Sequence, residues 1–417
     1  MQFLLSAGEA SGDTYGAQLI DALRQLAPSS SFFGMGGEKM RASGCELLID
    51  AKDVAVVGLV EVVKHLPDIR RRFKHLVAEA AQRKPDAAIL IDFPDFNLRL
   101  ASELHRLGIS VFYFVSPQIW AWRTGRVQQI KKYVRKMIVI FPFEQEFYAR
   151  HGVEVSYVGH PLAYEPPPRI SREQFAAQQG LDPKKQWIAL LPGSRRKEVR
   201  LNLAPMVEAA GLLQQKGNFE FVLPVASTLS AAWLSEQLGL CTSAAKAGNL
   251  HDHNRRSEGL LHPAAGNSGE DASACSSSHA PLIHLTHNAR ATLMHARAAV
   301  VASGTATVEA ALSGTPFVVV YRLAPLTWLL GRRLVKLDTF AMPNLIAGKK
   351  IVPELIQKDF TAQNVARELN AIIPDRPARQ QMEAALKMVQ QRLHDSPDAE
   401  APARRAARQI LGTLKSG

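Results

Sequence analysis

The sequence is poor in the features that mark secreted and membrane-spanning proteins. It has only three cysteines, Cys45, Cys241 and Cys275, which are odd in number for a disulfide framework and too far apart for a metal site. No apolar run is long enough to cross a bilayer, and the amino-terminal residues lack the basic segment and long apolar core of a signal peptide. These absences predict a protein of the reducing cytoplasm whose contact with any membrane is peripheral.

The charge of the chain is unbalanced toward the positive. Lys and Arg number 50 against 38 acidic residues, so the formal net charge is +12. This surplus favours an anionic partner, which charge alone leaves open between a phosphorylated substrate, a nucleic acid and an acidic membrane. With 417 residues, 47% of them hydrophobic, the chain is expected to form two globular domains.

Strand-like apolar runs alternate with amphipathic helical patterns through the first third of the chain. Gln2–Ala7 and Ala87–Ile91 are two such strands, and residues 15–26 and 97–107 are two such helices. The alternation predicts an α/β fold of βαβ units with a parallel sheet. Ligands are therefore expected at the carboxyl ends of the strands.

A proline run at 166–168 disfavours both helix and sheet, so we place a domain boundary beside it. The predicted domains are residues 1–163 and 164–417. Residues 241–281 are rich in Ser, Ala, Gly, His and Asn and are predicted to be a flexible surface insertion, whose histidines match no familiar zinc spacing. The tail at 361–414 has a helical pattern that suits bracing helices.

Acidic residues stand in two of the loops that follow predicted strands. Asp92 comes directly after Ala87–Ile91, where its carboxylate would face a ligand, and we predict that it is a general base. Asp95 precedes a helical pattern and suits an N-cap. In the loop after the first strand, Ser11 and Asp13 either cap the next helix or contact a sugar hydroxyl, and capping leaves Glu9 unexplained.

Tryptophans and a basic helix suggest a surface for apolar or anionic groups. Trp120 and Trp122 lie beside Arg123 and predict either a stacking and cation–π surface or a buried turn. Residues 60–84 form a basic amphipathic pattern that fits either an anionic membrane or a helix packed on a sheet. Trp328, followed by a basic cluster, has the same two interpretations.

Two loops of the second half resemble phosphate cradles. At 187–198 a short strand leads through a glycine turn into a hydroxyl, arginines and a helix, and at 300–309 a strand ends in Ser-Gly-Thr before another helix. Backbone amides at a helix N-terminus bind phosphate, so the pair predicts one bound diphosphate, with its ribose on a glutamate. The candidate ligand-binding residues are Gly193, Ser194, Arg195, Ser303, Gly304, Thr305, Glu309 and, in the loop at 341–345, Asn344.

Six segments resemble the lipid-A-disaccharide synthase family, and they occur in that family's order. They are SAGEASGD at 6–13, IDFPDFN at 91–97, VSPQIWAWR at 115–123, LLPGSR at 190–195, SGTATVE at 303–309 and MPNL at 342–345. The resemblance covers residues 2 to about 393. The insertion at 241–281 is longer than the family pattern leads us to expect, and Arg196 and Lys197 make the phosphate loop more basic.

The resemblance implies a GT-B glycosyltransferase of family 19, in which two Rossmann-like domains face each other across a cleft, with bracing helices at the C-terminus. The N-terminal domain would hold the acceptor, 2,3-diacylglucosamine 1-phosphate, and the C-terminal domain the donor, UDP-2,3-diacylglucosamine. The expected reaction forms a β-1,6 bond with inversion and releases UDP in lipid A biosynthesis. The expected place is the cytoplasmic face of the inner membrane, with no nucleic acid as partner and a homo-oligomer left open.

The same resemblance implies roles for the candidate residues. Asp92 would be the base, with Glu9 or Asp95 as substitutes, and Arg195 would neutralise the leaving diphosphate. No Asp-x-Asp occurs in the chain, so no metal and no cofactor is expected, and protein cations must hold the diphosphate. The implied acceptor or acyl-chain surface comprises Ser11, Asp13, Trp120, Trp122 and Trp328.

Three other functions fit parts of the sequence. A UDP-sugar 2-epimerase shares the architecture and the UDP site. A basic nucleic-acid-binding protein accounts for the net charge, although the cations are spread out and no known reader module is present. A non-catalytic lipid-binding protein accounts for the basic amphipathic segments, and would not depend on Asp92.

Overall fold

The computed structural model describes residues 1–54, 59–122, 124–241, 281–323, 339–394 and 400–416, with the backbone alone at 59–65, 121, 122 and 124. The predicted insertion, apart from its ends, and Trp328 therefore lie outside the described residues, as does the side chain of Trp122. The described residues divide into two compact units, the first made of those within 1–165 together with 391–394 and 400–416, and the second of residues 166–241, 281–323 and 339–390. None of the described helices is long and apolar enough to cross a bilayer.

The first unit is built on a parallel sheet whose strand order is β3-β2-β1-β4-β5-β6-β7. Its strands are apolar on both faces, as expected when helices cover the two sides of a parallel sheet, and all five residues of β4 are buried. The strands are β1 (Gln2–Ala7), β2 (Ser31–Gly36), β3 (Cys45–Asp50), β4 (Ala87–Ile91), β5 (Ser110–Phe114), β6 (Lys136–Val139) and β7 (Val155–Tyr157).

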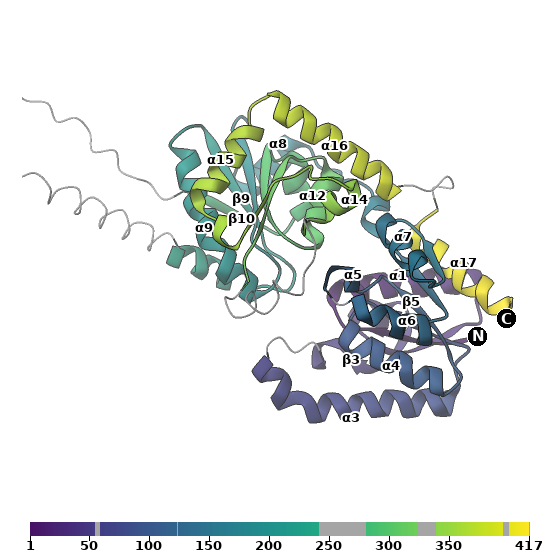
Figure 1. Ribbon diagram of the computed structural model, residues 1–417. Coiled ribbons are helices and arrows are strands. Elements are labelled where there is room, and N and C mark those ends of the chain that lie inside the picture. The colour runs from purple at the N-terminus through teal and green to yellow at the C-terminus, as the bar shows by residue number, and fades with distance from the viewer. Residues whose placement is uncertain (55–58, 123, 242–280, 324–338, 395–399, 417) are drawn as a thin grey trace, which may run out of the picture. The chain divides into compact units, whose positions relative to one another are not determined.

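The helices of the first unit connect successive strands and pack on the sheet (Figure 1). They are α1 (Ala10–Leu26), α2 (Glu38–Ala42), α3 (Leu59–Arg83), α4 (Pro94–Arg106), α5 (Ile119–Trp122), α6 (Val127–Tyr133) and α7 (Pro142–Arg150). In α3, the basic amphipathic segment, Leu76 and Ala80 are buried, and Phe73 packs edge-on against Phe96. The carboxyl half of α3 is therefore a core helix of this unit.

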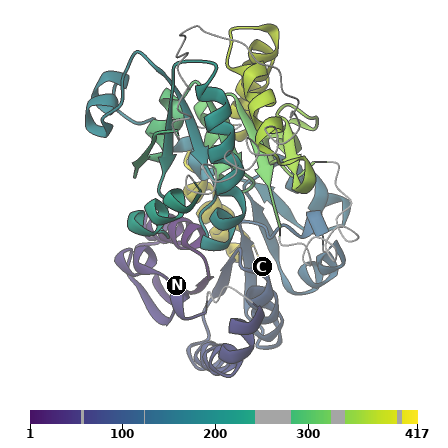
Figure 2. The same ribbon diagram turned by 90° about the vertical axis from the view of Figure 1, so that its left-hand side faces the viewer.

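The second unit repeats the same plan with a parallel sheet of order β10-β9-β8-β11-β12-β13. Its strands are β8 (Gln186–Leu191), β9 (Phe219–Pro224), β10 (Ile283–Thr286), β11 (Ala298–Ala302), β12 (Phe317–Tyr321) and β13 (Glu354–Ile356). Its helices include α8 (Arg172–Gln179), α9 (Arg196–Gln214), α11 (Ala289–His295), α12 (Thr305–Ser313), α14 (Met342–Ala347) and α15 (Ala362–Ile372). Figure 2 shows α9, in teal, beside the yellow-green α15, and the two helices pack together.

The strand order of each sheet contains one point where the chain reverses its direction of travel. In the first sheet β2 and β3 lie on one side of β1 and the later strands on the other, so the reversal falls between β1 and β4. In the second sheet it falls between β8 and β11. Ligands of open parallel sheets bind in the crevice at the carboxyl ends of such strand pairs, because the following loops diverge there.

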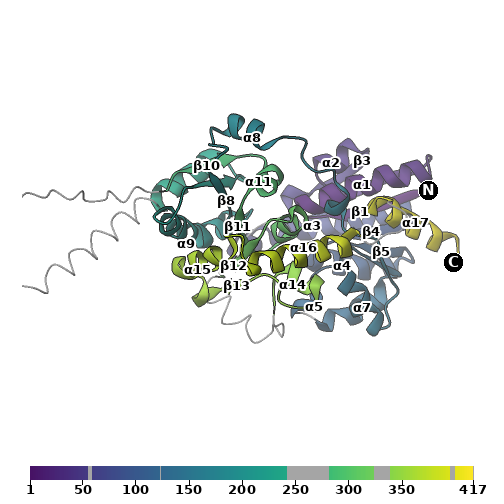
Figure 3. The same ribbon diagram turned by 90° about the horizontal axis from the view of Figure 1, so that it is seen from above.

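The C-terminal residues differ from the sequence prediction, which assigned the whole of 164–417 to the second domain. Helix α16 (Pro377–His394) begins in the second unit, but residues 391–394 and 400–416 belong to the first, where α17 (Pro402–Lys415) packs on α1 (Figure 3). Arg405 donates from Nη1 to the Val158 carbonyl at 2.9 Å, and Arg135 donates to the Thr413 carbonyl at 2.8 Å. Helix α15, in the same predicted tail, packs on α9 of the second unit, so the helices of the tail are divided between the two units.

Candidate functional site

A buried asparagine joins the two loops at the reversal point of the first sheet. Asn97 of α4 is fully buried, and its Oδ1 accepts the hydroxyl of Ser6, near the end of β1, at 2.6 Å. Its Nδ2 donates to the carbonyls of Ser6, Ile91 and Asp92 at 3.2, 3.2 and 2.8 Å. This single side chain therefore fixes the start of the Asp92 loop against β1.

The backbone beside Asp92 is held in a strained conformation. Asp92, Phe93 and Val115 have φ of 45°, 51° and 62°, and for the β-branched valine such a value is a genuine outlier. The Asp92 carbonyl accepts the Tyr113 hydroxyl at 2.6 Å, and its N–H donates to the Val115 carbonyl at 3.2 Å. Strain of this kind persists only where surrounding bonds impose it, and it concentrates at functional sites.

The loop after β1 packs closely on the loop after β4. A Cβ added at Gly8 would lie 2.4 Å from the ring of Phe93, so only glycine allows the two loops to approach this closely. The next residue, Glu9, is the extended N-cap residue of α1, but its side chain makes no capping hydrogen bond. The structure thus brings Glu9 and Asp92 to the same end of the sheet, on adjacent loops.

Asp13 is engaged by backbone amides inside the first unit. It is buried, and its carboxylate accepts the backbone N–H groups of Gly37, Lys39 and Met40 at 2.8, 3.1 and 3.0 Å. The residue therefore caps α2, a helix that follows the next strand, which favours the capping interpretation over contact with a sugar hydroxyl. Ser11 lies partly exposed in the first turn of α1 and stays a prediction.

Asp95 is engaged elsewhere and is not an N-cap. Phe93 occupies the N-cap position of α4, and Asp95 lies inside the first turn. Its side chain is 70% exposed and forms an ion pair with Arg126. A paired, solvated carboxylate is a poorer general base candidate than Asp92, whose loop is rigidly held.

Trp120 is anchored to a buried glutamate that sequence analysis did not select. Its Nε1–H donates to Oε1 of Glu144 at 3.2 Å, and its ring packs edge-on against Phe143. Glu144 is 1% exposed, and burial raises its pKa to about 8, an effect to which the charge of Asp92 adds. The indole N–H of Trp120 therefore bonds to a buried carboxyl group, which favours the interpretation of this segment as a buried turn.

The loop after β8 has the conformation of a tight glycine turn that leads directly into a helix. Gly193 has φ of +124°, and the Pro192 carbonyl accepts Nδ2 of the buried Asn202 at 2.9 Å. The Ser194 carbonyl accepts the Thr228 hydroxyl at 2.5 Å, so the turn is pinned from two sides. Arg195 is the N-cap residue of α9 and places its guanidinium beside the helix N-terminus.

The amides of this turn are occupied by a side chain of the same helix. Oε2 of Glu198 accepts the N–H groups of Ser194 and Arg195 at 3.1 and 3.3 Å. Oε1 of Glu198 lies 3.5 Å from Nη1 of Arg195. The guanidinium of the next residue, Arg196, lies over the ring of Trp233, with Cζ 5.3 Å from the centroid.

The loop after β11 forms a second helix N-terminus beside the first, because β8 and β11 are neighbours in the sheet. The Ser303 N–H donates to the Val320 carbonyl at 3.0 Å, and Gly304, with φ of +144°, precedes the first residue of α12, the exposed Thr305. Glu309 is the fifth residue of α12 and is partly exposed. These positions fit a ligand at the reversal point.

Tyr321, at the end of β12, is a candidate that sequence analysis did not assign. Burial raises the pKa of its hydroxyl; the negative charge of Glu198 adds to this and the positive charge of Arg195 opposes it. The phenol therefore lies within electrostatic reach of the Arg195–Glu198 pair. Its position at the carboxyl end of a predicted strand is the sequence feature that could have identified it, and that strand lies next to β11.

Asn344, predicted as a ligand contact, is engaged within the second unit. It is fully buried, its Oδ1 accepts the N–H groups of Ile351 and Val352 at 2.7 and 2.9 Å, and its Nδ2 donates to the Val352 carbonyl at 3.0 Å and Glu354 at 2.6 Å. Glu354 also accepts the Phe340 N–H at 2.9 Å. Asn344 thus fastens α14 to the segment before β13 and has no capacity left for a ligand.

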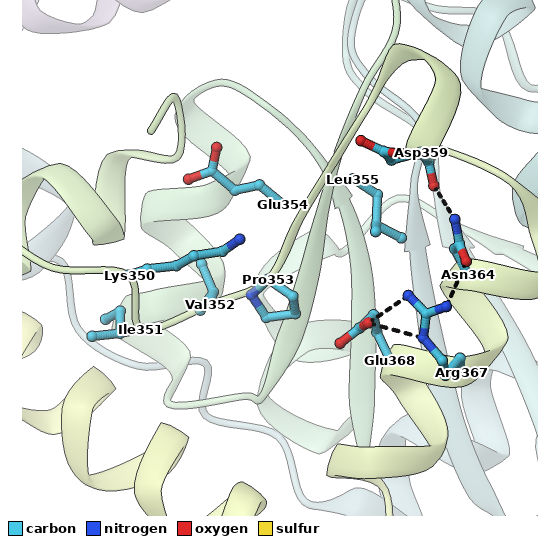
Figure 4. Close-up of a pocket in the computed structure, with 10 residues that line it drawn as sticks. All are labelled: Lys350, Ile351, Val352, Pro353, Glu354, Leu355, Asp359, Asn364, Arg367 and Glu368. Carbon is cyan, nitrogen blue, oxygen red and sulfur yellow. Dashed lines mark hydrogen bonds and ion pairs between the residues drawn. The ribbon is translucent and has the colours of Figure 1, made fainter. Parts of the chain in front are cut away.

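A cavity of about 450 Å³ lies elsewhere in the second unit, along β13 and α15 (Figure 4). Three of its polar residues bond to one another: Arg367 donates to Glu368 at 3.0 Å and to Oδ1 of Asn364 at 2.7 Å. Nδ2 of Asn364 donates to the backbone carbonyl of Asp359 at 2.9 Å. None of the predicted site residues lines it. This cavity is therefore not the candidate site.

Two parallel α/β units, each with a loop cluster at its reversal point, place the protein in the GT-B fold class. The glycosyltransferase of kitacinnamycin shares this fold with a TM-score of 0.59 at 14% identity, covering 99% of this chain and 98% of that one. UDP-GlcNAc 2-epimerase from Neisseria meningitidis, solved with UDP-GlcNAc, aligns with a TM-score of 0.56 at 12% identity over the full length of both chains. The predicted fold class is confirmed, and at these identities the fold does not separate transferases from epimerases.

The sequence decides between them, because the chain belongs to the lipid-A-disaccharide synthase family. The family model described as lipid-A-disaccharide synthetase matches residues 3–255 and 263–407. The lipid-A-disaccharide synthase of Koribacter versatilis is 50% identical over 416 residues, covering 100% of this chain and 99% of the relative. That of Acidobacterium capsulatum is 50% identical over 400 residues, covering 96% and 93%. The predicted family and a glycosyltransferase activity in lipid A biosynthesis are confirmed, and the epimerase alternative is not favoured.

Proposed function

We propose that the protein joins UDP-2,3-diacylglucosamine to 2,3-diacylglucosamine 1-phosphate through a β-1,6 bond and releases UDP. The groups at the two reversal points support this proposal. Carboxylates suited to a general base lie in the first unit, and amides, hydroxyls and a guanidinium suited to a diphosphate lie in the second. The first unit accordingly holds the acceptor and the second the UDP of the donor.

The proposed reaction is one displacement with inversion. Asp92 accepts the proton of the acceptor 6-hydroxyl while its oxygen attacks the anomeric carbon, and the bond from that carbon to the diphosphate breaks with its electron pair leaving on UDP. Arg195, the Ser194 amide and the amides at 303–305 stabilise the negative charge that develops on the diphosphate. Glu309 accepts hydrogen bonds from the ribose hydroxyls.

The donor set around the proposed diphosphate site supports a reaction held by protein cations. Arg195 is the N-cap residue of α9, where a helix N-terminus adds about half a positive charge. No step of the proposed displacement requires a metal ion, because the guanidinium and the amides supply the charge. We propose no cofactor.

The expected product is detected directly by mass spectrometry. Incubation with both acylated sugars should yield the disaccharide 1-phosphate and an equal amount of UDP. An epimerase would convert the donor without the acceptor, so a control that omits the acceptor separates the two functions. Failure to form disaccharide with both substrates present contradicts the proposed function.

We also propose that the protein binds the inner-membrane surface peripherally, because both substrates carry acyl chains and the chain is basic. The described part of α3 supplies fewer unpaired cations than its sequence suggests, since Arg71 pairs with Asp68 at 3.0 Å and Arg72 with Asp53 at 2.8 Å. Protein should sediment with anionic liposomes at low salt and be released at high salt. Protein that stays in the supernatant at low salt contradicts the proposal.

A further inference from the structure

Glu198 makes more bonds to the phosphate loop than a helix cap requires. In a capping box, a glutamate three residues into the helix reaches back to the N–H of the N-cap residue. Glu198 does this to Arg195, but the same oxygen also accepts the Ser194 N–H one residue earlier, at 3.1 Å. The reciprocal bond of the box is missing, because the Arg195 guanidinium has only donors and makes no capping bond.

The carboxylate is packed directly against the turn. A Cβ added at Gly193 would lie 2.6 Å from Oε2 of Glu198, so this oxygen contacts the backbone of the turn itself. The other oxygen, Oε1, lies within ion-pair distance of Arg195, at 3.5 Å. The Ser194 amide and the Arg195 guanidinium, two of the donors assigned to the diphosphate, therefore already surround one internal anion, together with the Arg195 amide.

A diphosphate and this carboxylate compete for the same donors. Each backbone N–H makes one strong hydrogen bond, and two anions at one helix N-terminus repel each other. The side chain of Glu198 is 33% exposed, so it has solvent beside it into which to rotate. Binding of UDP at this loop therefore requires the release of Glu198.

We propose that Glu198 is a built-in anion that keeps the phosphate loop in its binding shape, is displaced by the diphosphate of UDP, and returns to its amides to favour release of the product. This inference rests on the proposed function, since it concerns the regulation of the same site. While the loop is empty, the carboxylate offsets the charge of Arg195 and satisfies the amides. When UDP leaves, the return of Glu198 to those donors lowers the free energy of the product-free protein and so favours release.

The test compares UDP binding by the full-length protein and the variant Glu198→Gln, by isothermal titration calorimetry. The neutral amide oxygen still suits a capping box but competes less strongly for the amides and for Arg195, so UDP should bind about tenfold more tightly, or about 1.4 kcal/mol. Uridine, which has no phosphate, should bind both proteins equally. UDP should also inhibit the variant more strongly as a product.

Two further variants separate the role of Glu198 from a general effect of charge on UDP binding. Glu208→Gln removes the same charge from an exposed position of the same helix, and its UDP affinity should equal that of the unchanged protein. Glu198→Ala frees the amides entirely but also removes the side chain that holds the turn in its binding shape, so its gain in UDP affinity should be smaller than that of Glu198→Gln. Unchanged or weaker UDP binding by Glu198→Gln, or an equal change for uridine, overturns the inference. Absence of UDP binding by the unchanged protein overturns the proposed function instead.

Discussion

Turnover is expected to fall by about three orders of magnitude in Asp92→Asn, because removal of a general base typically costs a factor of about 10² to 10⁴. Asparagine has the same shape and cannot accept the proton of the acceptor hydroxyl. It is also among the residues that tolerate the left-handed backbone found at position 92, so the loop should keep its conformation. The measurement is the initial rate of disaccharide formation at saturating concentrations of both substrates.

Neighbouring carboxylates provide the controls for this result. Asp95→Asn should retain most of the activity, because Asp95 is solvated and paired with Arg126. Glu9→Gln tests the other carboxylate predicted as a base at the same end of the sheet. If Asp92→Asn stays within a factor of ten of the unchanged protein while Glu9→Gln loses turnover, the base is Glu9. UDP affinity should be the same in all three variants, since the proposed UDP site lies in the other unit.

The strand-end rule found the position of Asp92 because it needs only local information. An apolar run followed by an acidic residue marks the carboxyl end of a strand, and parallel sheets gather ligands at that end. The order of the strands was not predictable in the same way. That β1 lies next to β4, and β8 next to β11, depends on tertiary packing, yet it is this order that brings the Glu9 and Asp92 loops together.

Asp13 and Asn344 show why the contacts of some polar residues could not be predicted. Both fall in segments with the composition of ligand-binding loops, but the structure places them in the first turns of α1 and α14. There their oxygens accept backbone N–H groups from segments more than five residues away. A sequence pattern does not show which distant amides need an acceptor. Glu144 shows the opposite case, a residue that was not selected although its position is special. Its aromatic neighbours in the sequence do not show that its carboxyl is buried and bonded to Trp120.

The second large effect is expected at Arg195. Arg195→Ala should lower kcat/KM by a factor of about 10² to 10³, because the guanidinium is the side chain proposed to meet the charge that develops on the leaving diphosphate. UDP binding should weaken as well, whereas uridine binding should not change. Both follow from initial rates with varied donor and from calorimetric titration with each ligand.

Variants of Arg196 and Glu198 provide the controls for Arg195→Ala. Arg196→Ala removes an equal charge from the next residue, but its guanidinium lies over Trp233, so kcat/KM should change by no more than about threefold. If the two variants lose activity equally, the effect is one of general positive charge and the role of Arg195 is refuted. The substitution Arg195→Ala should weaken UDP binding by a larger factor in the Glu198→Gln protein than in the unchanged protein. The reason is that no internal carboxylate then competes with UDP for the guanidinium. That coupling would place the diphosphate and Glu198 on the same donors, because two residues that act independently on UDP give additive free energies.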